Sequence, residues 1–384
     1  MQYIKPSYYD EFKCIGAKCP DTCCSGWQIM IDEETLCHYR KMKGKLGESI
    51  RAGIDEEESC FLQEENGDCH FLRRDGLCQI FWTSQKEEDW CDTCRTYPRH
   101  IEEFEDVREI SLGMSCPEAA RIIFSQTEPL CLLTEEDEEY EEYEDFDYLL
   151  YSKLLDIREL LLKQLQDRRK PMERRFALAK AEILACQKAI DENRIFEIDG
   201  ILGSWEKELS SNNREKELGS EQEKADWKEK RYAERKAFFS YLKEFELLRE
   251  SWQLLRDEAY ELLYREGAES YAEKLEEFYR RGYAGGADGW ELAMEEIAVY
   301  FVFVYLCGAV YDDRLLEKYE MAEFSAKCIE ELCIAQMLKR GRAADQRDLI
   351  RISSGFCREL EHSDENLNLL EDLLYEANKE QEKQ

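Results

Sequence analysis

The sequence lacks the features of an exported or membrane-spanning protein. Its first residues, MQYIKPSYYDEF, contain no basic stretch followed by an apolar run, so we expect no secretory signal. The longest apolar run, 297–311, lies between acidic pairs and is shorter than the roughly 20 residues that a membrane helix needs. We therefore expect a buried core helix at 297–311 and a cytoplasmic protein that does not interact with membranes.

Basic residues are scarce relative to acidic ones. Lys and Arg number 53 and Asp and Glu number 87, which gives a formal net charge of −34. An acidic surface without a basic patch repels a phosphate backbone, and this excludes nucleic acid as the expected partner. The same surface either attracts a positively charged partner, such as a lysine-bearing protein, or serves only to keep the chain soluble.

Seventeen cysteines are too many, and odd in number, to pair completely as disulfides in a reducing compartment. Eleven of them lie between Cys14 and Cys116. The other six are scattered in helical patterns and are typical of small buried apolar residues. Metal binding by the first group is the leading explanation.

Four sequence segments carry that first group. The opening segment FKCIGAKCPDTCCSGW is a short turn-rich loop, which can direct several thiolates onto one centre. The later segments are GDCHFLRRDGLCQIF, WCDTCRTYPRH and SCPEAAR. Only Cys91 and Cys94 make the CxxC pair that zinc sites favour, and the irregular spacing elsewhere favours an iron–sulfur cluster, with zinc as the alternative. A redox dithiol would need a strand–helix setting, which CDTC lacks.

The chain divides at an acidic run. Residues 134–147 contain ten carboxylates, so we expect an exposed connector at 134–148 between a cysteine-rich domain, 1–133, and a helical domain, 149–384. Apolar residues at three- and four-residue intervals predict helices over 149–170, 172–193, 232–266, 270–281, 290–310, 315–339, 345–361 and 364–377. A polar insertion is expected near 203–230. The predicted fold class is mainly α, with an irregular metal-binding N-terminal domain, an all-α C-terminal domain and few strands.

Some local contacts are also predictable. We expect Asp32 to start a helix at DEETLCHYRKM, and Glu118 and Arg121 to bond across the first turn of the helix after Cys116. Trp27 is expected to pack beside the cysteine loop.

The cysteine segments also match a family pattern. FKCxxxxCxxxCCxGWxIxID, from Phe12 to Asp32, followed by CHFL, LCQI, CRTYPRH and SLGMSCPEAAR, resembles the flagellin lysine-N-methylases, a branch of cysteine-cluster proteins described as zinc- or iron-chelating. EHSDENL, at 361–367, extends the resemblance into the helical half. The resemblance implies a protein-lysine N-methyltransferase that moves a methyl group from S-adenosylmethionine to lysine side chains of flagellin and carries a [4Fe-4S] cluster.

The resemblance also implies site residues. The cysteines on the family pattern are Cys14, Cys19, Cys23, Cys24, Cys69, Cys78, Cys94 and Cys116, more than the four ligands of one cluster, while Cys37, Cys60 and Cys91 fall outside it. Arg95 and Arg99, in CRTYPRH, would offset the thiolate charge or clamp a carboxylate of the cofactor.

Two common signatures of methyl-transfer enzymes are missing. No glycine-rich turn follows a strand, as Rossmann-type methyltransferases require. In the CxxxCxxC pattern of radical enzymes, Cys19 and Cys23 supply the first interval but Gly26 takes the third place. The sequence therefore assigns no catalytic residue and no adenosyl pocket. A non-enzymatic metal-binding scaffold and an iron–sulfur oxidoreductase remain alternatives.

Overall fold

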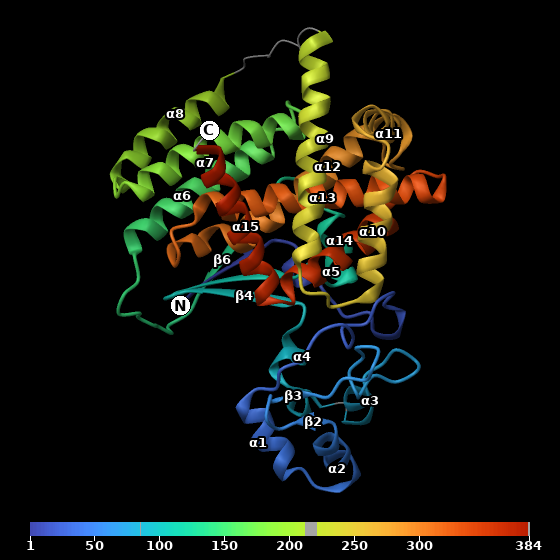
Figure 1. The fold of residues 1–384 in the computed structure, drawn as a ribbon. Coiled ribbons are helices and arrows are strands. Elements are labelled where there is room, and N and C mark those ends of the chain that lie inside the picture. Colours follow the sequence, from blue (N-terminus) through green and yellow to red (C-terminus); the bar gives the residue numbers. More distant parts are fainter. Residues whose placement is uncertain (85, 212–220, 383–384) are drawn as a thin grey trace.

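The computed structural model describes residues 1–84, 86–211 and 221–382. Figure 1 shows a small lobe, formed by the cysteine-rich segment, beneath a large helical body that also contains a four-stranded sheet.

The body contains the helices that the periodicity predicts, and a further helix at Ile198–Ser210 that it does not predict. They are α6 (Tyr148–Leu165), α7 (Met172–Asp191), α8 (Ile198–Ser210), α9 (Glu221–Glu244), α10 (Glu250–Tyr264), α11 (Ala268–Arg281), α12 (Gly286–Tyr305), α13 (Leu315–Arg340), α14 (Gln346–Glu361) and α15 (Asp364–Glu382). The mainly helical fold class is thus confirmed. The single helix predicted over 232–266 is wrong, because the chain leaves helical geometry at 245–249 and α9 and α10 are separate. Helix α13 is buried along most of its length and packs against α7, α10, α12 and α14.

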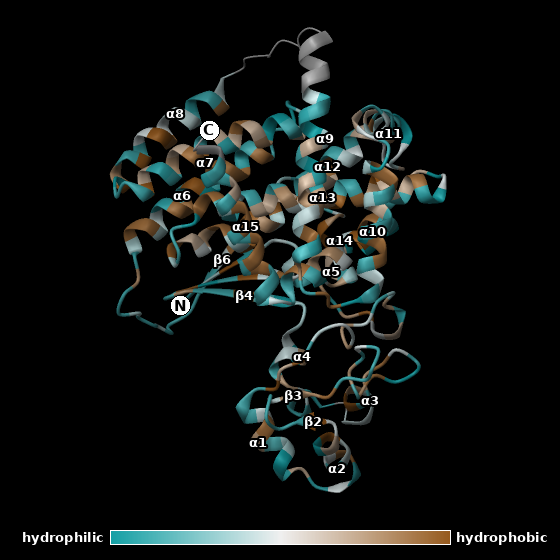
Figure 2. Ribbon diagram, in the orientation of Figure 1, coloured by the Kyte–Doolittle hydropathy of each residue, from teal (hydrophilic) through white to brown (hydrophobic). Residues whose placement is uncertain are grey.

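Helix α12 is the predicted core helix. Together with the turn Leu306–Val310 it is long and apolar enough to cross a membrane, but 83% of its apolar window is buried inside the body. Figure 2 shows hydrophobic segments gathered where the helices of the body face one another. Burial on all sides is typical of the central helix of a globular core, and cytoplasmic localisation stays a prediction.

The sheet was not anticipated. It runs in the order β4-β5-β1-β6, with β1 (Gln2–Pro6) parallel to β5 (Val107–Leu112) and antiparallel to β6 (Leu132–Glu136), and with β4 (Arg99–Phe104) antiparallel to β5. The expectation of an irregular N-terminal domain with few strands is wrong here. The strands are short and their partners lie far apart in the sequence, so alternation within a single segment gives little signal.

The small lobe has a core of its own. It contains α1 (Glu33–Lys41), α2 (Gly44–Ala52), β2 (Ile54–Asp55), β3 (Cys60–Phe61), α3 (Gln79–Ser84) and α4 (Asp92–Thr96), packed around buried side chains such as Tyr39, Phe61 and Phe71. Asp32 caps α1 as predicted, since its carboxylate accepts a hydrogen bond from the Thr35 N–H at 2.8 Å.

The segments around the predicted boundaries belong largely to the body. Its core includes Tyr8, Phe12 and Phe104 as well as α5 (Pro117–Ile123), where the predicted Glu118–Arg121 bond forms at 2.7 Å. The acidic run begins within β6 and continues as an exposed loop. In the predicted insertion, 203–210 continue α8 and 221–230 belong to α9, while 212–220 lie outside the described residues. The domain limits at 133 and 148 remain predictions.

A buried ion pair ties the sheet to the helices. Arg158 on α6 donates to the Glu109 carboxylate of β5 at 2.5 Å, and the two side chains are 4% and 2% exposed. The sheet therefore lies fixed against α6 while its outer strands border the surface.

Candidate metal centre at the junction of lobe and body

The cysteine loops are held together by backbone bonds. The Cys69 N–H donates to the Cys24 carbonyl at 2.8 Å, and the Gly26 N–H donates to the Gly67 carbonyl at 2.9 Å, so the opening loop pairs with the CHFL segment. An isolated bridge between Leu72 and Cys78 closes the next loop. These contacts bring the first two cysteine segments side by side.

Three thiols from these two segments are in contact. Cys24 hydrogen-bonds through its side chain to both Cys23 and Cys78. The hydrogen bond from Cys24 lowers the pKa of Cys78 to about 7 and also lowers the pKa of Cys23. The pKa of Cys24 is raised, first by its bonds to these neighbours and then by burial. Cys24 thus keeps its proton, while Cys23 and Cys78 lose theirs more readily than a free thiol does, and the thiolate is the form that binds metal.

A second thiol pair comes from the third segment. Cys94 hydrogen-bonds through its side chain to Cys91, which lowers the pKa of Cys91 and raises that of Cys94. Charges on Cys78 and Cys23 raise the pKa of Cys94 further, so this pair lies beside the first group. Cys91, which the family pattern leaves out, is fully buried and belongs to the same neighbourhood.

The other predicted ligands surround these five thiols. Burial raises the pKa of Cys69 to about 12 and that of Cys116 to about 11, and both sulfurs also feel the charge of Cys23. Burial raises the pKa of Cys19, which is within electrostatic reach of Cys23 and of the exposed Cys14. The eight predicted cysteines thus lie within electrostatic reach of one another through Cys19, Cys23 and Cys78, and their role as ligands stays a prediction.

The donor set fits a metal in its chemistry. Among the described residues no group of three or more His, Cys, Asp or Glu side chains is already arranged to hold a metal ion. The thiols occur instead as a hydrogen-bonded trio and a hydrogen-bonded pair. Soft sulfur donors without carboxylates among them are the set that iron–sulfur clusters and zinc use.

Two arginines from the body form hydrogen bonds and ion pairs with the opening cysteine loop. Arg358, on α14, donates to the carbonyls of Ser115 and Thr22, each at 2.9 Å, and pairs with the Asp21 carboxylate at 2.9 Å. Arg249, just before α10, also pairs with Asp21 at 2.9 Å and reaches the Ser25 carbonyl at 2.5 Å. The charge of Arg358 offsets part of the burial effect that raises the pKa of Cys19, and it adds to the Cys24 hydrogen bond that lowers the pKa of Cys23.

The two predicted cofactor-binding arginines have other neighbours. Arg95 is half-exposed and pairs with Asp92 on the same helix. The Arg99 guanidinium lies 5.5 Å from the centre of the Phe12 ring and 6.0 Å from that of Tyr9. Their assignment to a cofactor stays a prediction. Among the arginines near the thiols, Arg358 is the one whose positive charge lowers the pKa of Cys23.

The EHSDENL segment completes the junction. The His362 ring lies 4.4 Å from Trp27 and 5.7 Å from Tyr97, centre to centre. Burial, followed by the charges of Arg358 and Arg249, lowers the pKa of His362 to about 3, so its imidazole is neutral at physiological pH. Sequence reasoning gave His362 no role, because the histidine and the two rings it meets come from three distant segments.

The preceding residue forms a buried acid–tyrosine cluster. Glu361 Oε1 accepts hydrogen bonds from the hydroxyls of Tyr300, at 2.6 Å, and Tyr305, at 2.9 Å. The Tyr300 hydroxyl in turn accepts from the Met114 N–H at 3.1 Å, two residues before Cys116. Burial raises the pKa of Glu361, and its Oε2 is buried without a hydrogen-bond partner among the described residues.

The helical half identifies the family. A family model described as the FliB lysine N-methylase C-terminal domain matches residues 158–382, more than half of the chain. The chain belongs to the FliB lysine N-methylase family. The matched region includes α14 and EHSDENL, the parts of the body that contact the cysteine loops.

Curated relatives are similar over a shorter stretch. The chain is 27% identical over 140 residues to the flagellar biosynthetic protein FliU of Salmonella muenchen, which covers 33% of this chain and 80% of that one. It is also 27% identical over 140 residues to the lysine-N-methylases of Salmonella typhimurium and Salmonella choleraesuis, again over 33% of this chain. The match spans about a third, 34%, of the length of those two methylases. No solved structure matches the chain.

Proposed function

We propose that the chain transfers methyl groups from S-adenosylmethionine to lysine side chains of flagellin, and that its junction thiols hold a [4Fe-4S] cluster, with zinc as the alternative. Family membership and the names of the Salmonella relatives support the methylase activity. The observation that carries the proposal is the set of bonds made by Arg358. This arginine lies in the region that matches the family model, and it bonds Thr22 and Asp21 in the loop of Cys19, Cys23 and Cys24.

The junction provides the groups that such a reaction needs. A free lysine keeps its proton up to about pH 10.4, so the enzyme has to remove that proton before methyl transfer. Glu361 is suited to accept it, because burial raises the pKa of its carboxyl and two tyrosine hydroxyls fix Oε1 in place. Trp27, Tyr97 and His362 offer aromatic faces to a cationic sulfonium or ammonium.

The thiols have a separate role. A bound cluster would be held by ligands drawn from Cys23, Cys24, Cys78, Cys91 and Cys94 and would supply iron. Arg358 and Arg249 would keep the loop in place and balance the thiolate charge.

Methylation is tested with protein purified without oxygen and mixed with S-adenosylmethionine and unmethylated flagellin. We expect flagellin to gain methyl masses on lysine, in proportion to the iron content of the preparation. Cys78→Ser should lose both iron and activity, whereas the matched control Cys131→Ser, an exposed thiol outside the junction, should lose neither.

Other outcomes separate the alternatives. The absence of both a mass shift and cofactor binding would favour a scaffold, and reversible bleaching with turnover of a small molecule would favour an oxidoreductase. Glu361→Gln, which can still accept the two tyrosine bonds, should bind flagellin and cofactor yet lower kcat by about a hundredfold or more. Unchanged kcat in that variant would remove Glu361 from the mechanism.

A further inference from the structure

A groove lies between α6 and the segment that leads into β6. Its volume is about 510 Å³. Its apolar lining consists of Pro129, Leu130, Leu132, Leu155 and Leu162. Its polar lining consists of Arg158, whose charge is paired with Glu109, together with Glu159, Lys163 and Gln166. The volume falls within the range of ligand-binding clefts.

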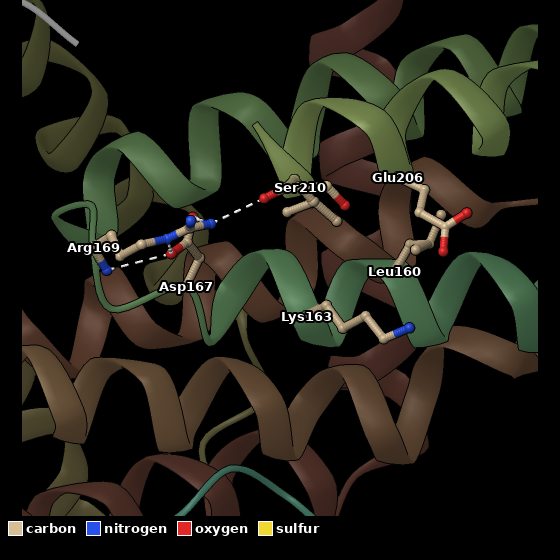
Figure 3. Close-up of a pocket in the computed structure, with 7 residues that line it drawn as sticks. Leu160, Lys163, Asp167, Arg169, Glu206 and Ser210 are labelled. Atoms are coloured by element: carbon tan, nitrogen blue, oxygen red, sulfur yellow. Dashed lines mark hydrogen bonds and ion pairs between the residues drawn. The ribbon is translucent and has the colours of Figure 1, made fainter. Parts of the chain in front are cut away.

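A second hollow on the other side of Lys163 differs in character. It measures about 300 Å³ and lies between α6 and α8. Figure 3 shows that Arg169 is directed onto Asp167 and onto the end of α8, so charged groups of this hollow bond to one another. Of these two hollows, the larger, apolar groove is the one that offers a surface for a partner.

Leu132, which lines the groove, is the first residue of a strand at the edge of the sheet. Strand β6 is the last strand of the sheet and pairs with β1 alone. Two backbone bonds show which residues of β6 face β1: the Ser7 N–H donates to the Cys131 carbonyl, and the Asp137 N–H donates to the Met1 carbonyl. By alternation in an antiparallel pair, Leu132, Thr134 and Glu136 direct their backbone N–H and carbonyl groups away from β1. No backbone partner for these groups is found among the described residues.

The charge next to this edge is strongly negative. The acidic run 134–147 begins in β6 and then forms the loop that joins β6 to α6. Glu135 and Glu141 pair with Lys5 and Arg108. Within the described part of the chain, no ion pair involves Glu138, Glu142 or Glu144, all exposed or half-exposed. A segment bearing lysines complements this charge, whereas a second copy of the acidic chain would be repelled.

We propose that an extended, lysine-bearing segment of the protein substrate docks here as an added strand on β6, with its apolar side chains in the groove and its lysines toward the acidic loop. The identity of the substrate rests on the proposed function, while the docking geometry does not. Strand addition supplies affinity through main-chain hydrogen bonds and selectivity through alternate side chains. The site would hold flagellin on the enzyme at a distance from the reacting lysine.

Thr134→Pro tests the added strand directly. Proline removes an outward N–H without removing a bond of the β1 ladder, which is where edge strands tolerate it. Thr134→Ala, which keeps that N–H, is the matched control. With purified unmethylated flagellin as the probe, we expect the proline variant to bind about tenfold more weakly, and the alanine variant to bind within about twofold of the original chain. The KM for flagellin should rise without a fall in kcat.

A second variant tests the charge. Replacing Glu138, Glu142 and Glu144 with Gln should weaken flagellin binding and flatten its dependence on salt. These side chains are on a surface loop, so this variant decides the question if circular dichroism shows that the proline variant does not fold.

Each result has a defined consequence. Unchanged flagellin affinity in both variants, or no flagellin binding by the original chain, would overturn the docking site even if methylation is observed. If binding depends on Thr134 and the acidic loop as expected but no methyl group is transferred, the docking site stands and the proposed function fails.

Discussion

Arg358 offers the sharpest test of the junction between lobe and body. Its guanidinium is almost completely buried, with 3% of the side chain exposed, and it bonds the carbonyls of Ser115 and Thr22 as well as the Asp21 carboxylate. Arg358→Met keeps much of the volume of the aliphatic stem and removes all three bonds. The two carbonyls would then be left without their partner inside the junction.

The magnitude follows from these contacts. A hydrogen bond that involves a charged group contributes about 1.5–3 kcal/mol, so the two carbonyl bonds together stabilise the closed junction by about 3–6 kcal/mol. The Asp21 carboxylate is 36% exposed, and solvent screening reduces its share to a small addition. Since about 1.4 kcal/mol corresponds to a factor of ten, opening of the loop should become at least about a hundredfold more frequent.

Hydrogen exchange followed by mass spectrometry measures that opening. Peptides covering residues 14–27 and 113–117 should exchange at least about a hundredfold faster in Arg358→Met, while peptides from α12 and α13 should not change. Arg347→Met is the matched control, because Arg347 lies on the exposed side of the same helix. Equal protection of 14–27 in the two variants would refute the role given to Arg358.

Three other perturbations have defined outcomes. Burial raises the pKa of Glu296 from 4.5 to about 8, so its contribution to stability is complete below pH 4.5 and is lost as the pH rises through about 8. In Glu296→Gln, the free energy of urea unfolding should therefore fall less steeply between these pH values. An equal fall in the variant and the original chain would count against this reasoning. Glu109→Gln leaves the Arg158 charge buried without its counter-ion and should lower the free energy of unfolding by about 3–5 kcal/mol in the same assay. A loss below about 1 kcal/mol would contradict this expectation. Removal of metal from the proposed centre should expose the small lobe to limited proteolysis while the body, which includes the sheet and α5 as well as α6 to α15, persists; uniform resistance after complete removal would show that the lobe folds unaided.

The helices were predictable because their signal is local. Leucines at three- and four-residue intervals define α6, and the carboxylate of Asp32 marks the start of α1. The break between α9 and α10 was not visible, since 245–249 contains neither Gly nor Pro. The sheet was missed for a different reason: β1 meets β6 across roughly 130 residues, and Glu135 and Glu136 make β6 look like part of an acidic linker.

The candidate site was only half predictable. The family pattern singled out eight cysteines of the junction, whose ligand roles stay a prediction, and left out Cys91, whose thiol bonds that of Cys94. The residues that connect the loops to the body, Arg249 and Arg358, lie more than 220 residues from the loop they hold. Single-sequence reasoning cannot reveal such contacts, and the one available signal was the EHSDENL segment next to Arg358.

The close contact at Gly26 explains why the loop departs from the CxxxCxxC pattern of radical enzymes. Gly26 adopts a positive φ of 85°, and a Cβ atom on it would lie 2.1 Å from Arg249 Nε. A cysteine at this position would therefore strain the backbone and displace an arginine that bonds Asp21 and Ser25. Because the chain carries a net charge of −34, a centre built from thiolates needs such a cation nearby. The thiols that would complete the centre come instead from the segments of Cys78 and Cys94, so any cluster chemistry here has to be organised differently from that of a single three-cysteine loop.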